Sequence, residues 1–295
     1  MTSTQAVGIV KRLFNAQKAG HGGTLDPLAD GILPIAFGEA TKTSAYAMDA
    51  DKDYTFIIEW GASTSTQDRE GEITARSDKR ASLDEVAKAL SGFLGEIEQV
   101  PPQFSAIKVN GERAYDLARD GETVDLKARK VELFEARLDE ASTVDQAIIH
   151  VTCGKGFYIR SLVRDLAEAL GLEGHVTSLK RTRVGAFSIN EAVSVAELDA
   201  MDDVEERRAQ LMSIETAMDD VPAIAIMASN VARLRHGNDI VLLPHEMEDF
   251  RNQRRDLLGE ESDDRLALAV CDGQAIALGE VRAGHFRPSR VFQTG

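Results

Sequence analysis

One stretch of the chain, residues 21–31 (His-Gly-Gly-Thr-Leu-Asp-Pro-Leu-Ala-Asp-Gly), most constrains how the chain can fold. Gly22 and Gly23 permit backbone angles that other residues avoid, and Pro27 fixes its own φ and favours an extended conformation at Asp26. The pattern predicts a stiff loop that holds the Asp26 carboxylate between two leucines. A carboxylate with buried flanks is costly unless a cation pairs with it, so we expect the rest of the chain to supply one.

The composition is that of a globular protein. The 295 residues are 43% hydrophobic and 28% charged, with no apolar run of membrane-spanning length and no amino-terminal secretion pattern. Cys153 and Cys271 lie far apart in the sequence, which suggests no disulfide framework and fits a reducing cytoplasm. There is no phosphate-binding or dinucleotide-binding glycine motif in the sequence. We therefore expect a cytoplasmic protein without a bound nucleotide cofactor or a metal.

The net charge of −15 argues against non-specific nucleic-acid binding, because phosphate neutralisation dominates such binding. The excess is concentrated in residues 191–264, which hold 19 acidic residues against seven arginines, a net charge of −12. The remainder is nearly balanced and includes the basic run 180–183 (Lys-Arg-Thr-Arg). The charge therefore leaves room for a shaped site with local basic patches.

Capping and periodicity predict alternating helices and strands before residue 190. Thr2 with Gln5 forms a capping box before a helix over 2–19, and Ser82 with Glu85 forms another before an amphipathic helix. The other predicted elements are helices through 40–48 and from 159, strands at 54–60, 131–138, 147–153 and 175–185, a loop over 64–81 and a turn at Asn110-Gly111.

The last hundred residues have a different pattern. The composition turns acidic from 194, and residues 219–222 mark a boundary. The charged piece 246–264 is predicted to be a mobile insertion. Short strands are predicted at 239–243, 266–271 and 274–281, the last two joined by an Asp272-Gly273 hairpin turn.

Four blocks of sequence carry a resemblance to a known family: residues 21–42, 100–115, 154–167 and 175–185. Together they resemble the bacterial TruB-type tRNA pseudouridine synthases, and the resemblance covers almost the whole chain. The family makes the pseudouridine at position 55 in the T loop of tRNA without a cofactor. The resemblance implies the same isomerisation here, with no redox step, phosphate donor or metal ion.

The resemblance also assigns roles to individual residues. Asp26 matches the catalytic aspartate, which attacks the ribose or assists its elimination, and Arg160 matches the active-site arginine that pairs with it and keeps it ionised. Tyr54 matches the tyrosine that stacks on the target uracil, near its C5 proton. Three further residues match the substrate-binding set: Tyr158, Leu179, which closes the uracil pocket, and His21, which stabilises the loop after the target base has been flipped out.

The implied fold is α+β. A pseudouridine synthase domain over 1–220 has a mixed or antiparallel central sheet with flanking helices, and a small β-barrel that resembles an RNA-binding PUA domain follows over 221–295. The implied partner is the T stem-loop of tRNA. We expect a monomer with no obligate protein partner and no membrane association.

Other interpretations of the sequence stay open. Without the resemblance, Asp26 fits an ordinary turn residue, Arg160 a surface arginine at a helix start, and Tyr54 a strand aromatic in the core. One alternative function is a tRNA-binding or tRNA-folding module with weak or no catalysis. Another is an Asp-dependent glycosyl-transferring enzyme for small nucleosides, against which the basic run 180–183 and the PUA-like tail argue.

The beginning of the sequence departs from the family pattern. The family normally starts with a strand and a Lys-Pro pair, whereas Met1-Thr2-Ser3 falls in the middle of that block. We expect, as a result, an unpaired edge on a neighbouring strand of the central sheet, partly uncovered apolar side chains beneath that edge, and the loss of one support of the Asp26 loop.

Overall fold

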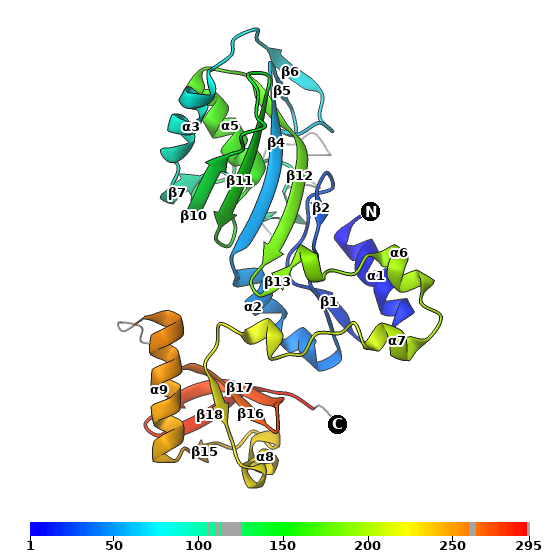
Figure 1. Ribbon diagram of the computed structural model, residues 1–295, viewed down its shortest axis with the longest axis vertical. Coiled ribbons are helices and arrows are strands. Elements are labelled where there is room, and N and C mark those ends of the chain that lie inside the picture. Colours follow the sequence, from blue (N-terminus) through cyan, green and yellow to red (C-terminus); the bar gives the residue numbers. More distant parts are fainter. Residues whose placement is uncertain (106, 110–111, 114–124, 260–263, 294–295) are drawn as a thin grey trace.

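The computed structural model describes residues 1–295 except 106, 110–111, 114–124, 260–263 and 294–295. Two β-sheets with their helices lie one above the other in Figure 1, and a group of short helices projects beside the junction. The fold is α+β, as predicted. Within the described ranges, no helix is long and apolar enough to cross a membrane.

The central sheet has seven strands, in the order β13-β12-β4-β11-β10-β7, and β2 also pairs with β12. The β2–β12 pairing is parallel and the others are antiparallel, so the sheet is mixed, as predicted. Its strands are β2 (Asp30–Gly31), β4 (Lys52–Trp60), β7 (Gly95–Gln99), β10 (Arg129–Leu138), β11 (Gln146–Cys153), β12 (Gly174–Val184) and β13 (Phe187–Ser188).

Alternation along the strands and helical periodicity together produce the main core. On β4, Phe56 and Ile58 are fully buried. They pack in one apolar cluster with Leu162 and Leu166 of helix α5 (Ile159–Leu170) and with residues of α3 (Leu83–Ser91). Burial of such side chains contributes about 1.5–3 kcal/mol each. The cluster fixes α5 against the sheet and therefore fixes the first turn of α5, which carries Arg160.

Both predicted capping boxes are confirmed: Thr2 with Gln5 caps α1 (Ser3–Leu13), and Ser82 with Glu85 caps α3. Helix α1 ends at Leu13 rather than at residue 19, because Asn15 adopts a left-handed conformation with a φ of 46°. The chain then enters β1, which pairs with β3. The elements here are β1 (Ala19–His21), β3 (Ile35–Phe37), η1 (Gly38–Thr43) and α2 (Ser44–Asp49).

The prediction of a loop over 64–81 is confirmed for 65–72 and 77–81, but it missed a short strand between them. Strand β5 (Ala62–Thr64) pairs with β6 (Ile73–Arg76) in a short antiparallel hairpin. Most side chains of β6 are exposed, so the hairpin lacks the apolar alternation that marks a half-buried strand. The turn predicted at Asn110-Gly111 lies outside the described residues, between β8 (Lys108–Val109) and β9 (Glu112–Arg113), which pair with each other.

The C-terminal sheet is curled, consistent with the PUA-like barrel that was predicted (Figure 1). Its strand order is β14-β16-β17-β18-β15. The predicted hairpin turn is confirmed, with φ of 50° at Asp272 and 76° at Gly273. The elements of this part are β14 (Ala223–Ala225), α8 (Ala228–Arg235), β15 (Ile240–Val241), β16 (Leu266–Cys271), β17 (Gln274–Arg282) and β18 (His285–Val291).

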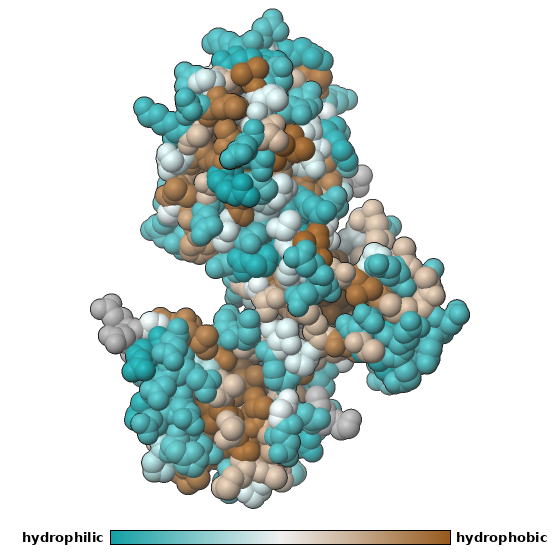
Figure 2. Space-filling view, in the orientation of Figure 1, coloured by the Kyte–Doolittle hydropathy of each residue, from teal (hydrophilic) through white to brown (hydrophobic). Residues whose placement is uncertain are grey.

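The prediction of a mobile insertion over 246–264 was wrong for the residues that the structure describes. Most of this piece belongs to helix α9 (Pro244–Leu258), whose outer face is hydrophilic in Figure 2. Phe250 is 3% exposed in the C-terminal core, and the Gln253 side chain both donates to and accepts from the backbone of Ala223, at 2.9 Å each. A few inward-facing side chains therefore hold α9 against the C-terminal core, although the average composition of the helix is that of a disordered segment.

The connection between the two sheets runs through α6 (Val195–Ala200), α7 (Val204–Arg208) and the short η2 (Ile189–Glu191) and η3 (Thr216–Met218). The end of the chain also contacts the amino-terminal part. Lys42 Nζ donates to the Val291 carbonyl at 2.6 Å, and the Glu39 carboxylate accepts from the Gln293 N–H at 2.7 Å. The segment after the Asp26 loop is thus joined to the C-terminal strand.

An apolar cavity of about 700 Å³ lies between α1, β3 and residues 210–217. Figure 2 shows hydrophobic surface in the hollow at this junction. In the described structure β3 pairs only with β1, in a register that turns the N–H and C=O groups of Ile35 and Phe37 away from β1. A free strand edge with apolar side chains beside it is therefore present, but it belongs to the β1–β3 sheet, whereas the sequence predicted it in the central sheet.

Candidate active site

The loop that carries Asp26 runs from β1 to β2 and lies against β12. Leu28 is buried in the main core, and the Ile32 N–H donates to the Arg181 carbonyl at 3.0 Å. Gly31 has a φ of 102°, and a Cβ at this position would lie 2.1 Å from the Arg181 carbonyl oxygen. Only glycine therefore allows the loop to approach β12 this closely.

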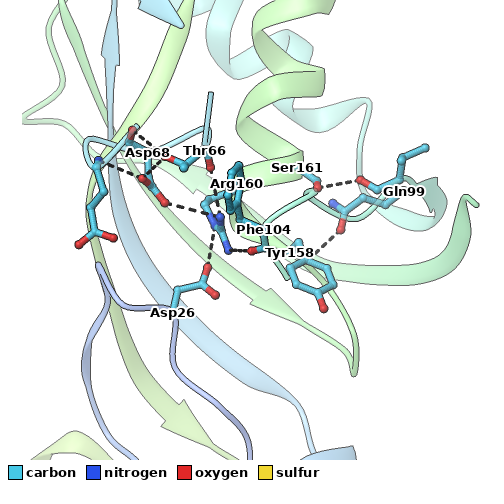
Figure 3. Close-up of polar contacts among 10 residues, drawn as sticks. Asp26, Thr66, Asp68, Gln99, Phe104, Tyr158, Arg160 and Ser161 are labelled. Atoms are coloured by element: carbon cyan, nitrogen blue, oxygen red, sulfur yellow. Dashed lines mark hydrogen bonds and ion pairs between the residues drawn. The ribbon is translucent and has the colours of Figure 1, made fainter. Parts of the chain in front are cut away.

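The predicted pairing of Asp26 with Arg160 is confirmed. Arg160 Nε donates to Asp26 Oδ2 at 2.8 Å, across 134 residues of sequence (Figure 3). The Arg160 side chain is 3% exposed, whereas the Asp26 side chain is 28% exposed. The carboxylate is thus less buried than the sequence predicted, and one of its faces stays open to a ligand.

Arg160 makes further contacts that the sequence did not predict. Nη1 donates to the Thr66 carbonyl at 3.1 Å and lies 3.6 Å from Asp68 Oδ2, and Nη2 donates to the Phe104 carbonyl at 3.0 Å. Asp68 is almost fully buried and accepts from Thr66 Oγ1 at 2.5 Å. The guanidinium is therefore held between two carboxylates, and three segments distant in sequence fix its orientation (Figure 3).

The first turn of α5 is tied to the end of β7. Tyr158 occupies the N-cap position, and its N–H donates to Gln99 Oε1 at 2.8 Å. Ser161 Oγ donates to the Val100 carbonyl, also at 2.8 Å. These bonds flank Arg160 on both sides in sequence (Figure 3). The backbone that carries the arginine is thus fixed by side chains as well as by the helix.

Two tyrosines lie within the electrostatic reach of Asp26. Burial raises the pKa of Tyr54 to about 12, although the positive charge of Arg181 opposes the shift and the negative charge of Asp26 adds to it. Burial, followed by the charge of Asp26, raises the pKa of Tyr158. Both phenols are therefore protonated at neutral pH. The structure brings these two rings, Asp26 and Arg160 into one site.

The other two predicted site residues lie at the margin of this group. His21 is on β1, and burial together with the charge of Arg181 lowers the pKa of its imidazole. Its Nδ1 atom is buried without a hydrogen-bond partner among the described residues. Leu179 is on β12 opposite Phe56 and is 4% exposed in the main core. His21 thus lies within the electrostatic reach of Arg181, and Leu179 precedes Arg181 by two residues on the same strand.

Sequence reasoning missed three residues that hold the site: Asp68, Gln99 and Arg181. Asp68 stands in a polar run that reads as a solvated loop, so no pattern distinguished it from its neighbours. The basic run 180–183 did contain a signal for Arg181. Side chains alternate between the two faces of a strand, so a strand through this run must direct some of its cations inward.

Family comparisons agree with this geometry. Residues 11–159 match the family model described as "TruB family pseudouridylate synthase (N terminal domain)", and residues 160–219 match "tRNA pseudouridylate synthase B C-terminal domain". The tRNA pseudouridine synthase B of Caulobacter vibrioides is 50% identical over 293 residues, which cover 99% of this chain and 93% of that protein. The protein of the same name from Rhizobium johnstonii is 46% identical over 297 residues, which cover 98% and 92%.

Solved structures share the architecture, including the C-terminal part. A chain of a Cbf5-Nop10-Gar1 complex matches with a TM-score of 0.67 and 25% identity, over 95% of this chain and 75% of that chain. A chain of an H/ACA RNP bound to a substrate RNA containing 2'-deoxyuridine matches with a TM-score of 0.70 and 21% identity, over 100% and 82%. By its match to the family model and its identity to these relatives over nearly its full length, the chain belongs to the TruB family of pseudouridylate synthases and is an enzyme of the isomerase class.

Proposed function

We propose that this enzyme converts uridine to pseudouridine at position 55 in the T loop of tRNA, with Asp26 as the catalytic residue. The observation that carries the proposal is the ion pair between Asp26 and Arg160 at 2.8 Å. The buried guanidinium orients the carboxylate, and the carboxylate keeps an open face toward a bound nucleotide. The relatives named as tRNA pseudouridine synthases support tRNA as the substrate.

The reaction rearranges the substrate without adding or removing atoms. The bond between C1′ of the ribose and N1 of uracil breaks, the base turns within the site, and C1′ bonds to C5. The proton on C5 then leaves, and N1 gains a proton. Asp26 serves either by attack on C1′ or by assistance to elimination at the ribose, and both routes use the same open carboxylate face.

The target uridine lies within folded RNA, so the base must leave its stack at a cost of a few kcal/mol. Tyr54 would stack on the flipped uracil, and Tyr158 and Leu179 would form the walls of its pocket. His21 would stabilise the loop at the vacated position. Because the pKa of Tyr54 is raised to about 12, its ring is a protonated stacking platform at neutral pH rather than a phenolate base.

The C-terminal part would add RNA contacts. We propose that residues 221–295 form a PUA-like unit that binds tRNA outside the T loop, and that the enzyme acts as a cytoplasmic monomer. The bonds from Lys42 and Glu39 to the last strand and its following residues would keep this unit next to the segment that carries Asp26. The position of the tRNA would thereby be coupled to the position of the catalytic loop.

The test is tritium release from a tRNA transcript that carries uridine labelled at C5. We expect release from a transcript with uridine at position 55 and none from a matched transcript with cytidine there. Binding of the transcript without any release would favour the tRNA-folding module instead. Conversion of free uridine at a rate equal to that of the transcript would favour an enzyme for small nucleosides.

A further inference from the structure

Among the residues that the structure describes, Arg181 is the largest of the fully buried side chains, with 1% of its surface exposed. A buried cation is costly unless a carboxylate or several acceptors surround it. Its neighbour on the same strand, Arg183, makes a bidentate ion pair with Asp53 at 2.8 Å. Across the described residues, no carboxylate lies within 4.0 Å of the Arg181 guanidinium. The Arg181 guanidinium is therefore stabilised by hydrogen bonds rather than by an ion pair.

The acceptors are two backbone carbonyls on either side of Asp26. Nε and Nη2 of Arg181 donate to the Ile32 carbonyl at 3.0 and 2.8 Å, and Nη2 also donates to the Gly23 carbonyl at 3.1 Å. Gly23 precedes Asp26 in the loop and Ile32 follows it. One planar guanidinium thus joins the two ends of the loop.

The main chain of Arg181 holds the same loop. Its carbonyl accepts from the Ile32 N–H at 3.0 Å, and it pairs with Gly31 where β2 runs parallel to β12. The side chain is needed at the other end, where Gly23 has no backbone bond to β12 among the described residues. The Gly22 N–H already joins the two flanking segments by donating to the Pro34 carbonyl at 2.8 Å, and the guanidinium adds the contact that ties the Gly23 end of the loop to β12.

Arg181 also lies behind two residues of the proposed uracil site. It stands opposite Tyr54 in the β12–β4 register, and its charge acts on both Tyr54 and His21. Because its side chain is 1% exposed, a bound nucleotide cannot touch it. Any effect on the reaction must pass through the loop and these two neighbours.

We propose that Arg181 is a positioning residue of the isomerisation, which ties both ends of the Asp26 loop and so holds the carboxylate at its reacting position. The inference rests on the proposed function. Loss of the guanidinium leaves Asp26 and Arg160 present and leaves the Gly22–Pro34 backbone bond in place, but it removes the tie between Gly23 and β12 and so loosens this end of the loop. A displacement of a catalytic group by about 1 Å costs about a hundredfold in rate. The contacts that bind tRNA elsewhere are unchanged, so the loss falls on kcat rather than on KM.

The experiment compares Arg181→Ala and Arg181→Lys with Arg183→Ala as the matched control. Arg183 is on the same strand, and its removal breaks an ion pair away from the loop. We expect kcat to fall by about a hundredfold in Arg181→Ala, with KM and the Kd for tRNA within about threefold of the wild type. Arg181→Lys should be intermediate, because an ammonium group lacks the fork that reaches both carbonyls. Arg183→Ala should keep its kcat within about threefold.

Chemical rescue of Arg181→Ala distinguishes a loss of loop positioning from a general loss of protein stability. Ethylguanidinium supplies the atoms that Arg181→Ala removes, so it should restore part of kcat, whereas ethylammonium at the same concentration should not. Circular dichroism gives the folded fraction of each variant. If Arg181→Ala does not fold, the kcat and KM of the folded Arg181→Lys variant test the positioning role instead.

The possible outcomes either support the positioning role of Arg181 or contradict it. A lower kcat at unchanged KM, with rescue specific to guanidinium, supports the inference. Unchanged kcat, a rise in KM alone, or a rate loss equal to the loss of folded protein overturns it. A wild-type enzyme that releases no tritium from tRNA would instead overturn the proposed function, so the two failures are distinguishable.

Discussion

Arg160 and Asp26 form an ion pair at 2.8 Å in which the cation is 3% exposed and the carboxylate 28% exposed. The asymmetry matters because a fully buried pair presents nothing to a substrate, and a fully exposed pair is screened by water. In the proposed reaction, the protein interior would orient the ion pair and the exposed side of the Asp26 carboxylate would contact the substrate.

Asp26→Asn tests the role of the carboxylate. The amide keeps the shape of the side chain and a carbonyl acceptor for Arg160 but removes the nucleophilic charge. We expect tritium release to fall by at least about 10³-fold, because loss of a nucleophile removes most of the catalysed rate, while the Kd for tRNA stays within about threefold. Asp30→Asn, in the same loop at an exposed position, is the control and should be active. Appreciable turnover by Asp26→Asn would exclude the assignment.

Arg160→Met should destabilise the fold as well as abolish activity. It leaves two carboxylates without their cation, a loss of about 3–5 kcal/mol in comparable buried pairs. Because the Asp68 side chain is 4% exposed and that of Asp26 28%, Asp68→Asn should rescue the melting temperature of Arg160→Met more than Asp26→Asn does. Double-mutant cycles measured by thermal melting give the two coupling free energies. Additive effects in both cycles would mean that neither carboxylate is coupled to Arg160.

Gly31→Ala should displace the catalytic loop. The residue has a φ of 102°, and its Cβ would lie 2.1 Å from the Arg181 carbonyl. Strain of this kind costs about 1–3 kcal/mol before the clash is counted, so we expect a lower melting temperature and a large loss of kcat. Gly8→Ala is the control: it lies within α1, has open space around its Cβ, and should stabilise the protein by about 0.5–1 kcal/mol. Equal melting temperatures of Gly31→Ala and Gly8→Ala would contradict the close approach of Gly31 to the Arg181 carbonyl.

His21 should make the fold less stable in acid. Burial and the charge of Arg181 lower its pKa in the folded state below the ordinary value of 6.5. Below about pH 6.5 the unfolded chain therefore binds a proton that folded His21 does not, and stability falls as the pH falls. Above that pH the imidazole is neutral in both states and contributes no dependence. Unfolding in urea at about pH 7.5 and pH 5 should show a smaller acid loss for His21→Asn than for the wild type; an equal loss would contradict the shift.

Helix α9 should be part of the folded C-terminal core. Phe250→Ala removes a side chain that is 3% exposed, and should cost about 3–5 kcal/mol of stability. Arg251→Ala, at the next and exposed position, should cost less than about 0.5 kcal/mol. Turnover of an isolated T stem-loop, which depends on the Asp26 site, should be unchanged in both. Thermal melts with no difference between the variants would indicate that α9 does not pack.

The sequence predicted those features that depend on local pattern. The strand at 54–60, the two capping boxes and the Asp272-Gly273 turn each have a short-range cause, and each is present. The pairing of Asp26 with a cation followed from the cost of burying a carboxylate, and the family resemblance pointed to Arg160.

The features that were missed depend on contacts between distant segments. Asp68 has no local feature that separates a buried carboxylate from a solvated one, since its burial follows from where Arg160 arrives. The helical state of α9 depends on a few inward side chains, among them Phe250 and Gln253, whose partners lie on other strands. The average composition of residues 246–264 does not reveal these few inward-facing side chains, so it gave the wrong prediction of a mobile insertion.

The bond between Arg181 and the Gly23 carbonyl spans 158 residues, and this separation has a consequence for synthesis of the chain. Translation proceeds at about 5–20 residues per second, so the Asp26 loop leaves the ribosome roughly 8–30 s before the strand that closes it. During that interval the nascent chain carries the Asp26 loop without its contact to Arg181. An incomplete chain released before β12 is complete would therefore contain the aspartate but lack the bond that ties its loop to this strand.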